Sequence, residues 1–544
     1  ITGQINMEYR KPTDEKPLFL NASVMNDTKT DFNVASSLQM GEKWSTVLLG
    51  HVSGNFRTFD HNHDGFMDDP EMFQVNVANR WLYYGPTGVQ VRFGLRALQD
   101  MRKGGQSGYD YKKYTLASTS PWGSDIINRQ LNTYVKVGVP ISADNAKNIA
   151  FVADYTLTDM NLRAGASKYL ATQNSGFFNV LFQDEINDSH KFTLALGGTA
   201  DWFSEDFMRK VAAQKLDPGK TSKAFYNAGV SGEYTFHAGE KFSSILGFRG
   251  DWFNGEGFKA VPRLTLKYSP LEQIVLRANG GRGLRRALPV IDNIGVLSTG
   301  KAFTGAYSDH LLEDAWTFGG NATFYLPFGA SDDTYLSFDY FGTRFAEQMV
   351  VDYEHGLNAI DFYALGGKRS YSNNYQVDFN VEAFRRFTVS ATFRYTDAKV
   401  ELEGRGLVER PMTSRYKGVL NLQYATNLNK WIFDFTASVN GKSRVYEFMK
   451  VVRGEDGELL YKDGYTPVYP LLYLQVTKRF KGVDLYLGAE NLTNFRQKNV
   501  VIGTAIEGMS GHVDASRPDF DASAVWGPIM GTKFYLGARF TLWK

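Results

Sequence analysis

Apolar and polar residues alternate one by one along much of this chain. Residues 375–384 put apolar side chains at every second position and polar side chains between them: Tyr375, Val377, Phe379, Val381 and Ala383 against Gln376, Asp378, Asn380 and Glu382. Residues 191–202, 483–490 and 534–542 repeat the pattern. A β-strand points successive side chains to opposite faces, so each face of such a strand lies in a different environment. Helical periodicity is nearly absent, and the pattern predicts an all-β protein.

The alternating segments define 22 strands. We place them at about 17–26, 31–40, 43–57, 72–84, 88–100, 128–139, 148–159, 174–187, 191–203, 222–237, 241–253, 259–269, 272–282, 314–327, 334–350, 371–384, 386–398, 415–426, 431–441, 468–480, 482–490 and 531–543. Many are ten residues or longer, whereas soluble strands average about five or six. Short turns, such as 41–43, alternate with long loops, such as 283–313 and 491–530. These features predict a 22-stranded antiparallel transmembrane β-barrel with short periplasmic turns and long extracellular loops.

A soluble β-sandwich, a solenoid or a propeller would also show alternation. Their strands are shorter, and a propeller repeats at a fixed period, which we do not find here. Aromatic residues make up 15% of the chain and gather near strand ends, for example at Trp81, Trp202 and Trp252. Membrane barrels carry such aromatic girdles at both interfaces with water. The membrane barrel is therefore favoured.

The overall composition narrows the classes of function. The 544 residues include 60 Lys and Arg against 58 Asp and Glu, and this balance indicates no nucleic-acid partner. Cys is absent, which excludes disulfides, thiolate metal sites and Cys nucleophiles. No segment reaches the ~18 consecutive apolar residues of a membrane-spanning helix. The GxSxG, HExxH and phosphate-loop motifs are also absent, so we expect no catalytic residues and no enzyme.

A barrel of 22 strands encloses a lumen too wide for its own side chains to fill. Barrels of this size are plugged transporters. The chain starts at Ile1 without a signal segment, so we expect it to be part of a longer precursor. Residues 1–10 alternate but precede the first strand. We therefore assign 1–12 to the end of a plug domain or linker, and 13–544 to the barrel.

Four segments resemble TonB-dependent outer-membrane receptors, and the resemblance is strongest to receptors of the Bacteroidetes type. They are the opening ITGQINMEYRKP, the mid-barrel GRGLRRALPVIDNIG followed by EDAWTFGGNATFYL, the late strand YLGAENLTNFRQKN, and the closing WGPIMGTKFYLGARFTLWK. Two features depart from the family. Such barrels usually end on an aromatic residue, whereas Lys544 follows Trp543 here, and the plug, signal peptide and TonB box are not in these 544 residues.

The resemblance implies a transporter in the bacterial outer membrane that imports a scarce, bulky nutrient. A metal chelate is the first expectation, either a siderophore, cobalamin or haem. The implied partners are TonB with its inner-membrane energising complex, contacted through the plug and TonB box, and outer-membrane lipid with lipopolysaccharide. A surface lipoprotein is a further candidate partner. The alternatives are a SusC-like importer of glycans or peptides, a passive porin, and a barrel that serves as a platform in an outer-membrane complex.

A local motif, DHNHDGFMDDPE at residues 60–71, matches the template of a calcium-binding loop. The matching oxygen donors occupy positions 1, 3, 5, 7, 9 and 12: Asp60, Asn62, Asp64, Phe66 through its carbonyl, Asp68 and Glu71. Gly65 at position 6 permits the sharp turn that the template needs. The motif predicts a structural Ca²⁺ ion bound with low affinity, and cobalamin receptors of the family are similar in holding calcium in this loop region. An acidic turn without a metal, or a transition-metal site using His61 and His63, are the alternatives.

Several cationic and soft side chains on the long loops are weaker candidates for binding a ligand. Arg282, Arg285 and Arg286 can fork onto a carboxylate or phosphate of a substrate, although ion pairing with carboxylates of the plug or lumen, or with lipopolysaccharide, is the favoured interpretation. His310 lies where haem receptors place a His. The further His and Met pairs that suit haem or copper are His355 with Met349, and His512 with Met509.

Overall fold

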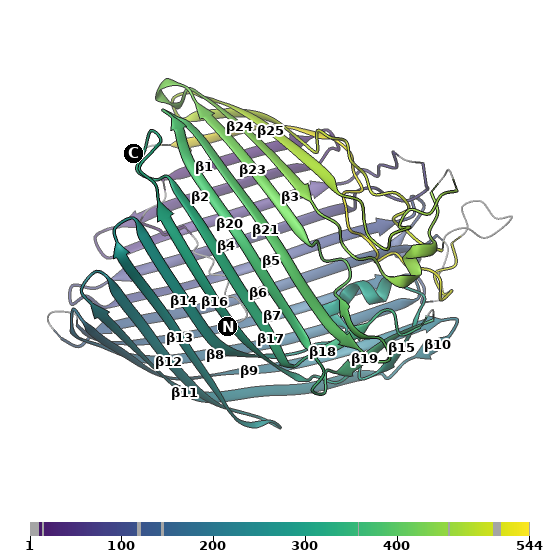
Figure 1. Cartoon of the computed structure of the whole chain (residues 1–544), viewed down its shortest axis with the longest axis horizontal. Helices are drawn as coiled ribbons and strands as arrows, with labels where there is room; N and C mark the ends of the chain where they lie inside the picture. Colours follow the sequence, from purple (N-terminus) through teal and green to yellow (C-terminus); the bar gives the residue numbers. More distant parts are fainter. Residues whose placement is uncertain are drawn as a thin grey trace.

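The computed structural model describes residues 10–13, 16–61, 63–116, 121–142, 146–356, 358–454, 457–503 and 513–542. They form a closed antiparallel barrel of 22 strands, as predicted (Figure 1). The barrel strands are β1 (Leu18–Met25), β2 (Thr30–Met40), β3 (Trp44–Asn55), β4 (Glu71–Tyr84), β5 (Gln90–Gly105), β6 (Gly123–Pro140), β7 (Lys147–Ala164), β8 (Ser167–Asn187), β9 (His190–Val211), β11 (Lys220–Ala238), β12 (Phe242–Phe253), β13 (Gly257–Leu271), β14 (Ile274–Arg286), β16 (Leu312–Tyr325), β17 (Tyr335–Glu347), β20 (Ser370–Phe384), β21 (Phe387–Leu402), β23 (Tyr416–Ala425), β24 (Trp431–Asn440), β25 (Tyr469–Arg479), β26 (Val483–Glu490) and β27 (Lys533–Leu542).

Shorter strands and helical turns are added to the barrel. Two strands prolong the barrel wall, β10 (Gln214–Leu216) beside β9 and β22 (Gly406–Glu409) beside β21. A separate three-stranded sheet contains β15 (Ala302–Gly305), β18 (Met349–Asp352) and β19 (Ala359–Ala364). The helical turns are η1 (Tyr111–Lys113), η2 (Ile291–Ser298), η3 (Asn427–Asn429) and η4 (Glu447–Val451). In the part of the chain that the structure covers, no helix is both long and apolar enough to cross a membrane.

The barrel closes where the first strand meets the last. Leu20 in β1 lies opposite Val34 in β2 and also opposite Phe540 in β27. Every barrel strand is paired on both sides in this way, so the sheet has no open edge along the wall. A closed sheet satisfies its backbone hydrogen bonds internally, which is the condition for a β-structure to cross a bilayer.

The outer face of the wall is apolar. Leu194, Leu196 and Leu487 are 51%, 54% and 58% exposed, and they belong to the alternating segments noted in the sequence. Aromatic rings meet on the outer face near the short turns, where Trp44 lies 6.4 Å from Trp81 between ring centroids. Large apolar side chains exposed in this continuous belt indicate contact with lipid.

The lumen face is polar and its side chains bond to one another. Asn132 in β6 donates to Asp154 and Thr156 of β7, at 2.7 and 2.8 Å. Asn321 in β16 donates to Ser337 and to Asp339 of β17 in the same way. The two faces of each strand therefore lie in different solvents, as the alternation predicts.

Several strands are longer than we predicted, because the alternation inverts where they leave the membrane. We expected β7 to end near 159 and β8 to begin near 174, but the two continue to Ala164 and Ser167. In this upper part Leu162 and Tyr169 point inward and are buried, whereas Arg163 points to the outer face. A predicted loop is therefore a tight hairpin, and the sheet rises above the membrane.

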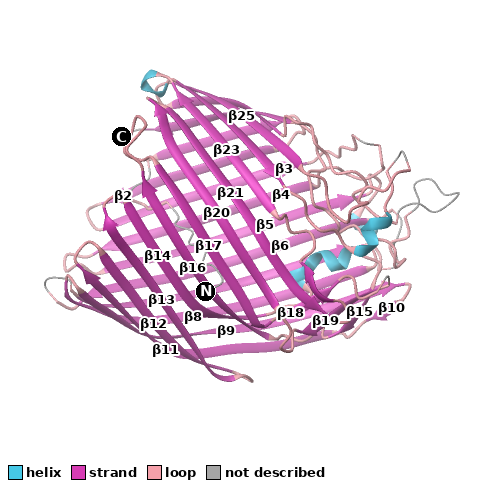
Figure 2. Ribbon diagram, viewed as in Figure 1, coloured by secondary structure: helices cyan, strands magenta, loops and turns pink. Residues whose placement is uncertain are grey.

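The connections at the two ends of the barrel differ sharply. Turns of a few residues close one end, and the long loops gather at the other, together with η2, β15, β18 and β19 (Figures 1 and 2). The longest connection, residues 491–532, joins β26 to β27. We call these two ends the short-turn end and the long-loop end.

Candidate functional site

The long loops are held at the barrel mouth by a hydrophobic core of their own. Inward side chains from the upper parts of β7, β8 and β9 pack against loop 287–311 and against loop 348–369, which includes β18 and β19. Phe303 of β15 lies between Phe207 of β9 and Phe362 of β19, with ring centroids 5.7 and 5.3 Å away. The loops are thus a folded layer attached to one side of the wall.

One arginine fastens this layer to the wall. Arg209 in β9 is fully buried, and its guanidinium donates to Ser167 Oγ, Thr299 O and Lys301 O at 2.5, 2.5 and 2.7 Å. It also lies over the ring of Phe303, 4.4 Å from the centroid. Its partners are carbonyl and hydroxyl oxygens, so the guanidinium supplies the hydrogen bonds that water would otherwise make to the turn that follows η2.

A second group of charges joins loop 348–369 to two more loops. Glu354 of loop 348–369 accepts from Arg444 at 2.6 Å and from Arg405 at 3.2 Å, and its side chain is 1% exposed. Burial opposes its charge, but Arg444 and Arg405 hold the pKa of Glu354 below its ordinary value. Arg405 also bonds to Asp352. Loops 348–369, 403–415 and 441–468 therefore form one unit.

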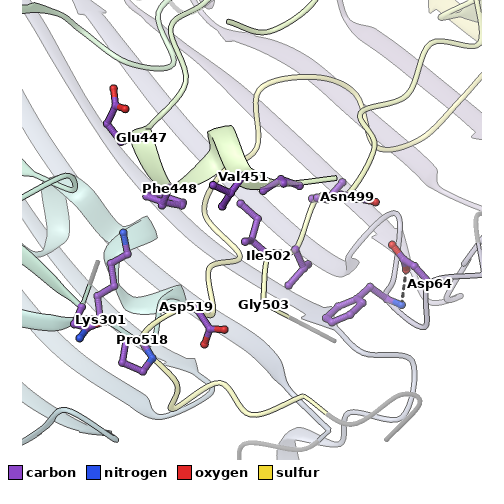
Figure 3. A pocket seen from close by; sticks show the side chains of 15 residues that line it. Asp64, Lys301, Glu447, Phe448, Val451, Asn499, Ile502, Gly503, Pro518 and Asp519 are labelled. Atoms are coloured by element: carbon purple, nitrogen blue, oxygen red, sulfur yellow. Dashed lines mark hydrogen bonds between the residues drawn. The ribbon is translucent and has the colours of Figure 1, made fainter. Parts of the chain in front are cut away.

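Between these loops lies a cavity of about 600 Å³. It is bounded by loops 56–70, 287–311, 348–369, 441–468 and 491–532, which are far apart in sequence. In Figure 3, Phe448, Val451 and Ile502 stand near the middle of the view, Asp519 stands below them beside Pro518, and Glu447 and Asp64 stand on opposite sides. A volume of this size, with mostly apolar walls and a few polar groups, is typical of a small-molecule site.

A single ammonium group is built into the cavity wall. Lys301 is 2% exposed, its Nζ lies 3.6 Å from the ring centroid of Phe448, and it donates to Tyr353 O at 3.2 Å. Burial lowers the pKa of Lys301. Tyr446 stacks on Tyr353 and on Phe448, so an aromatic stack supports the lysine.

The predicted calcium ligands lie in loop 56–70 and at the start of β4, and those that the structure describes are not grouped as a metal site. Asp60 accepts from the backbone N–H groups of Asp64 and Gly65, at 3.1 and 2.9 Å, and Gly65 has a φ of +84° as the motif requires. Asp68 turns to His61 at 2.9 Å, and Glu71 turns to Lys103 at 3.1 Å. The remaining side-chain ligand, Asn62, lies outside the described residues.

These contacts limit how a calcium ion fits. Glu71 begins β4 and shares the outer face of the wall with Val77. Phe66 packs on Trp122 in a small hydrophobic core. Nowhere in the described ranges are three or more His, Asp or Glu side chains grouped so that they could hold a metal ion. Calcium binding stays a prediction that requires Asp68 and Glu71 to exchange partners.

The three predicted arginines lie together at the long-loop end of β14, each beside carboxylates of the chain itself. Arg282 makes a two-pronged pair with Asp314 at 2.9 and 2.6 Å. The other pairs are Arg285 with Asp292 and Glu313, and Arg286 with Glu256. These are ion pairs within the chain, and ligand binding by the three arginines stays a prediction.

His310 lies next to these arginines in a desolvated position. Its ring contacts Phe203 and Phe225, and its Nδ1 lies 3.0 Å from Lys223 Nζ. Burial first, then Lys223 and Arg286, lower the pKa of His310 to about 4.

The other predicted His and Met pairs are separated or not described. His355 lies 3.6 Å from Asp361, whereas Met349 is buried in the hydrophobic core of the loops. His512 and Met509 lie outside the described residues.

Sequence reasoning missed Arg209, Lys301 and the fully buried Asp521, which accepts from the N–H and Oγ of Ser523. The inward position of Arg209 could have been predicted, because Phe207, Arg209 and Val211 alternate along β9 on the face that is buried above the membrane. For Lys301 and Asp521 the chain offers no local signal, because their surroundings come from distant loops.

No family model matches this chain, and no curated protein matches it. Solved structures share its fold. The closed form of the ferric-catecholate import receptor Fiu from E. coli K12 has a TM-score of 0.69 at 11% identity, over 99% of this chain and 84% of that one. The siderophore receptor PiuA from Acinetobacter baumannii has a TM-score of 0.64 at 12% identity, over 97% and 82%. The siderophore receptor PirA from Pseudomonas aeruginosa has 0.60 at 10% identity, over 96% and 80%.

These likenesses bear on the fold. All three proteins are named as receptors, and at 10–12% identity the likeness shows the shared fold alone. Together with the apolar outer belt, the shared architecture is that of a bacterial outer-membrane barrel.

Proposed function

We propose that this chain is the barrel of a TonB-dependent outer-membrane transporter that imports a scarce metal chelate. A siderophore is the first choice, with cobalamin and haem as the alternatives in the same class. The long-loop end faces the outside of the cell and captures the chelate. A plug in the lumen, coupled through TonB to the proton gradient of the inner membrane, then admits it.

One observation carries this proposal, namely a closed 22-stranded wall whose long loops fold together around a cavity at one end. Passive porins have 16–18 strands and an aqueous channel, whereas 22-stranded barrels are plugged transporters. The solved structures named above are import or siderophore receptors with the same wall.

The direct test is uptake of ⁵⁵Fe-labelled chelates by the native host, its deletion strain and the complemented strain. We expect the deletion to abolish uptake of one chelate at nanomolar concentration, and a protonophore to abolish uptake in the complemented strain. Uptake that persists with the protonophore would identify a passive pore. Loss of glycan or peptide uptake, with iron uptake intact, would replace the substrate class.

A further inference from the structure

We propose, building on the proposed import function, that the cavity at the long-loop end receives a compact and mainly apolar chelate that is neutral or positively charged. Polyanionic chelates, such as ferric tris-catecholates, bind there more weakly. The cavity thus selects its cargo by charge as well as by shape.

The lining favours an apolar surface. Apolar side chains supply much of the wall, among them those of Phe66, Phe448, Val451, Ile502 and Pro518, and a space of about 600 Å³ suits a ligand of small-molecule size. Val451 is 74% exposed, so its side chain presents apolar surface to an incoming molecule. Burying this surface against an apolar ligand is favourable roughly in proportion to its area.

The charges of the lining disfavour a polyanion. Asp64, Glu447 and Asp519 bring carboxylates to the lining, and Lys301 brings an ammonium group. Glu447 is paired with Lys450 at 2.8 Å and Asp519 with Arg517 at 2.6 Å, and the almost fully buried Lys301 bonds to Tyr353 O. A trianion entering the cavity therefore loses hydration without meeting an unpaired cation among these groups, which costs more than the entry of a neutral chelate.

The arginines around the cavity are engaged by the protein's own carboxylates. Arg444 and Arg405 bond to Glu354, and Arg517 bonds to Asp519 at 2.6 Å. Bidentate arginine is the usual means of binding carboxylate and catecholate-like oxygens. Moving Arg444 and Arg405 to a ligand would leave the buried Glu354 carboxylate without a cation, its remaining hydrogen bond coming from Glu447 N at 2.8 Å, which is strongly unfavourable.

The connections at the long-loop end also contain more acidic than basic residues. The connections at this end contain 24 Asp and Glu residues and 19 Lys and Arg residues, although the whole chain has 58 and 60. A negative mouth slows the approach of anions and favours neutral or cationic molecules.

The test compares two iron chelates on the full-length receptor in detergent, by isothermal titration. Ferrichrome is an uncharged ferric tris-hydroxamate, and ferric enterobactin is a trianionic tris-catecholate. We expect ferrichrome to bind at least tenfold more tightly. The triple variant Asp64→Asn, Glu447→Gln, Asp519→Asn should lower the ratio of the ferrichrome affinity to the ferric enterobactin affinity at least threefold.

Two controls keep the outcome interpretable. Glu42→Gln, Glu240→Gln and Glu272→Gln remove three exposed carboxylates at the short-turn end and leave the ratio unchanged. Val451→Trp fills the cavity and weakens the binding of ferrichrome at least tenfold, which locates the site.

Equal or tighter binding of ferric enterobactin, or a ratio that the triple variant does not move, overturns this inference. Either result leaves the import function standing if ⁵⁵Fe uptake requires the protein. Failure of every iron chelate in the uptake assay overturns the proposed function instead, so the two failures are distinguishable.

Discussion

Replacing Arg209 with methionine should release the loop layer from the barrel wall while the barrel stays folded. Methionine keeps much of the length of the side chain but removes the guanidinium that bonds to Thr299 O and Lys301 O at 2.5 and 2.7 Å. Each buried carbonyl left without a donor costs about 1–3 kcal/mol. We therefore expect opening of loop 287–311 to become easier by about 3 kcal/mol, which is roughly 10²-fold in its equilibrium constant.

Hydrogen–deuterium exchange of the full-length receptor measures this opening directly. The amides of Gly300 and Ala302 report on it, because they donate to Phe520 O and Asn358 O at 2.9 and 2.8 Å. Both should exchange roughly 10²-fold faster in Arg209→Met, whereas amides in the middle of β9 should not change. Arg129→Met is the matched control, since Arg129 is largely exposed beside Asp159. Unchanged protection of Gly300 and Ala302 would refute the role that we assign to Arg209.

Three further predictions address the loop histidine, the calcium motif and the outer face. The pKa of His310 is lowered to about 4 from 6.5, so the unfolded loop binds a proton before the folded loop does, and stability is lost as the pH falls from 6.5 toward 4. The opening equilibrium constant of loop 287–311, obtained by dividing each exchange rate by the intrinsic rate at that pH, should rise from pH 7 to pH 5. His310→Gln should weaken this dependence, and identical pH profiles of the two proteins would contradict it. Calcium should bind loop 56–70 with a Kd of about 10⁻⁴–10⁻³ M in titration calorimetry, and an Asp60→Ala variant that binds equally well would place the ion elsewhere. Leu196→Arg should lower the free energy of unfolding in lipid vesicles by about 2–4 kcal/mol if this outward side chain lies near mid-membrane. Thr193→Arg, at a position that points inward, is the control. Equal losses of stability in the two variants would argue against the assigned faces.

The barrel could be predicted from the sequence because its physics is local. Within the membrane a strand has lipid on one side and a polar lumen on the other. Every second residue is therefore apolar, as Leu194 and Leu196 are. All 22 strands were therefore found. Their upper ends were missed because Leu162 and Tyr169 reverse the sign of the alternation above the membrane.

The candidate site could not be predicted in the same way, since it depends on contacts between distant loops. Lys301 and Ile502 line one cavity although 200 residues separate them. The calcium motif shows that a match in sequence spacing alone does not fix where the side chains point. Glu71 matches the template by spacing, but the strand that begins there turns its side chain to Lys103 on the outer face.

The most direct test of the account is the position of iron in crystals of the full-length receptor with ferrichrome. Anomalous diffraction at the iron edge locates the metal without reference to any assumed ligand pose. The account predicts a single strong peak in the cavity at the long-loop end, beside Phe448, Val451 and Ile502. A peak confined to the short-turn end, or to the outer surface of the barrel, would contradict capture of a chelate by the folded loops.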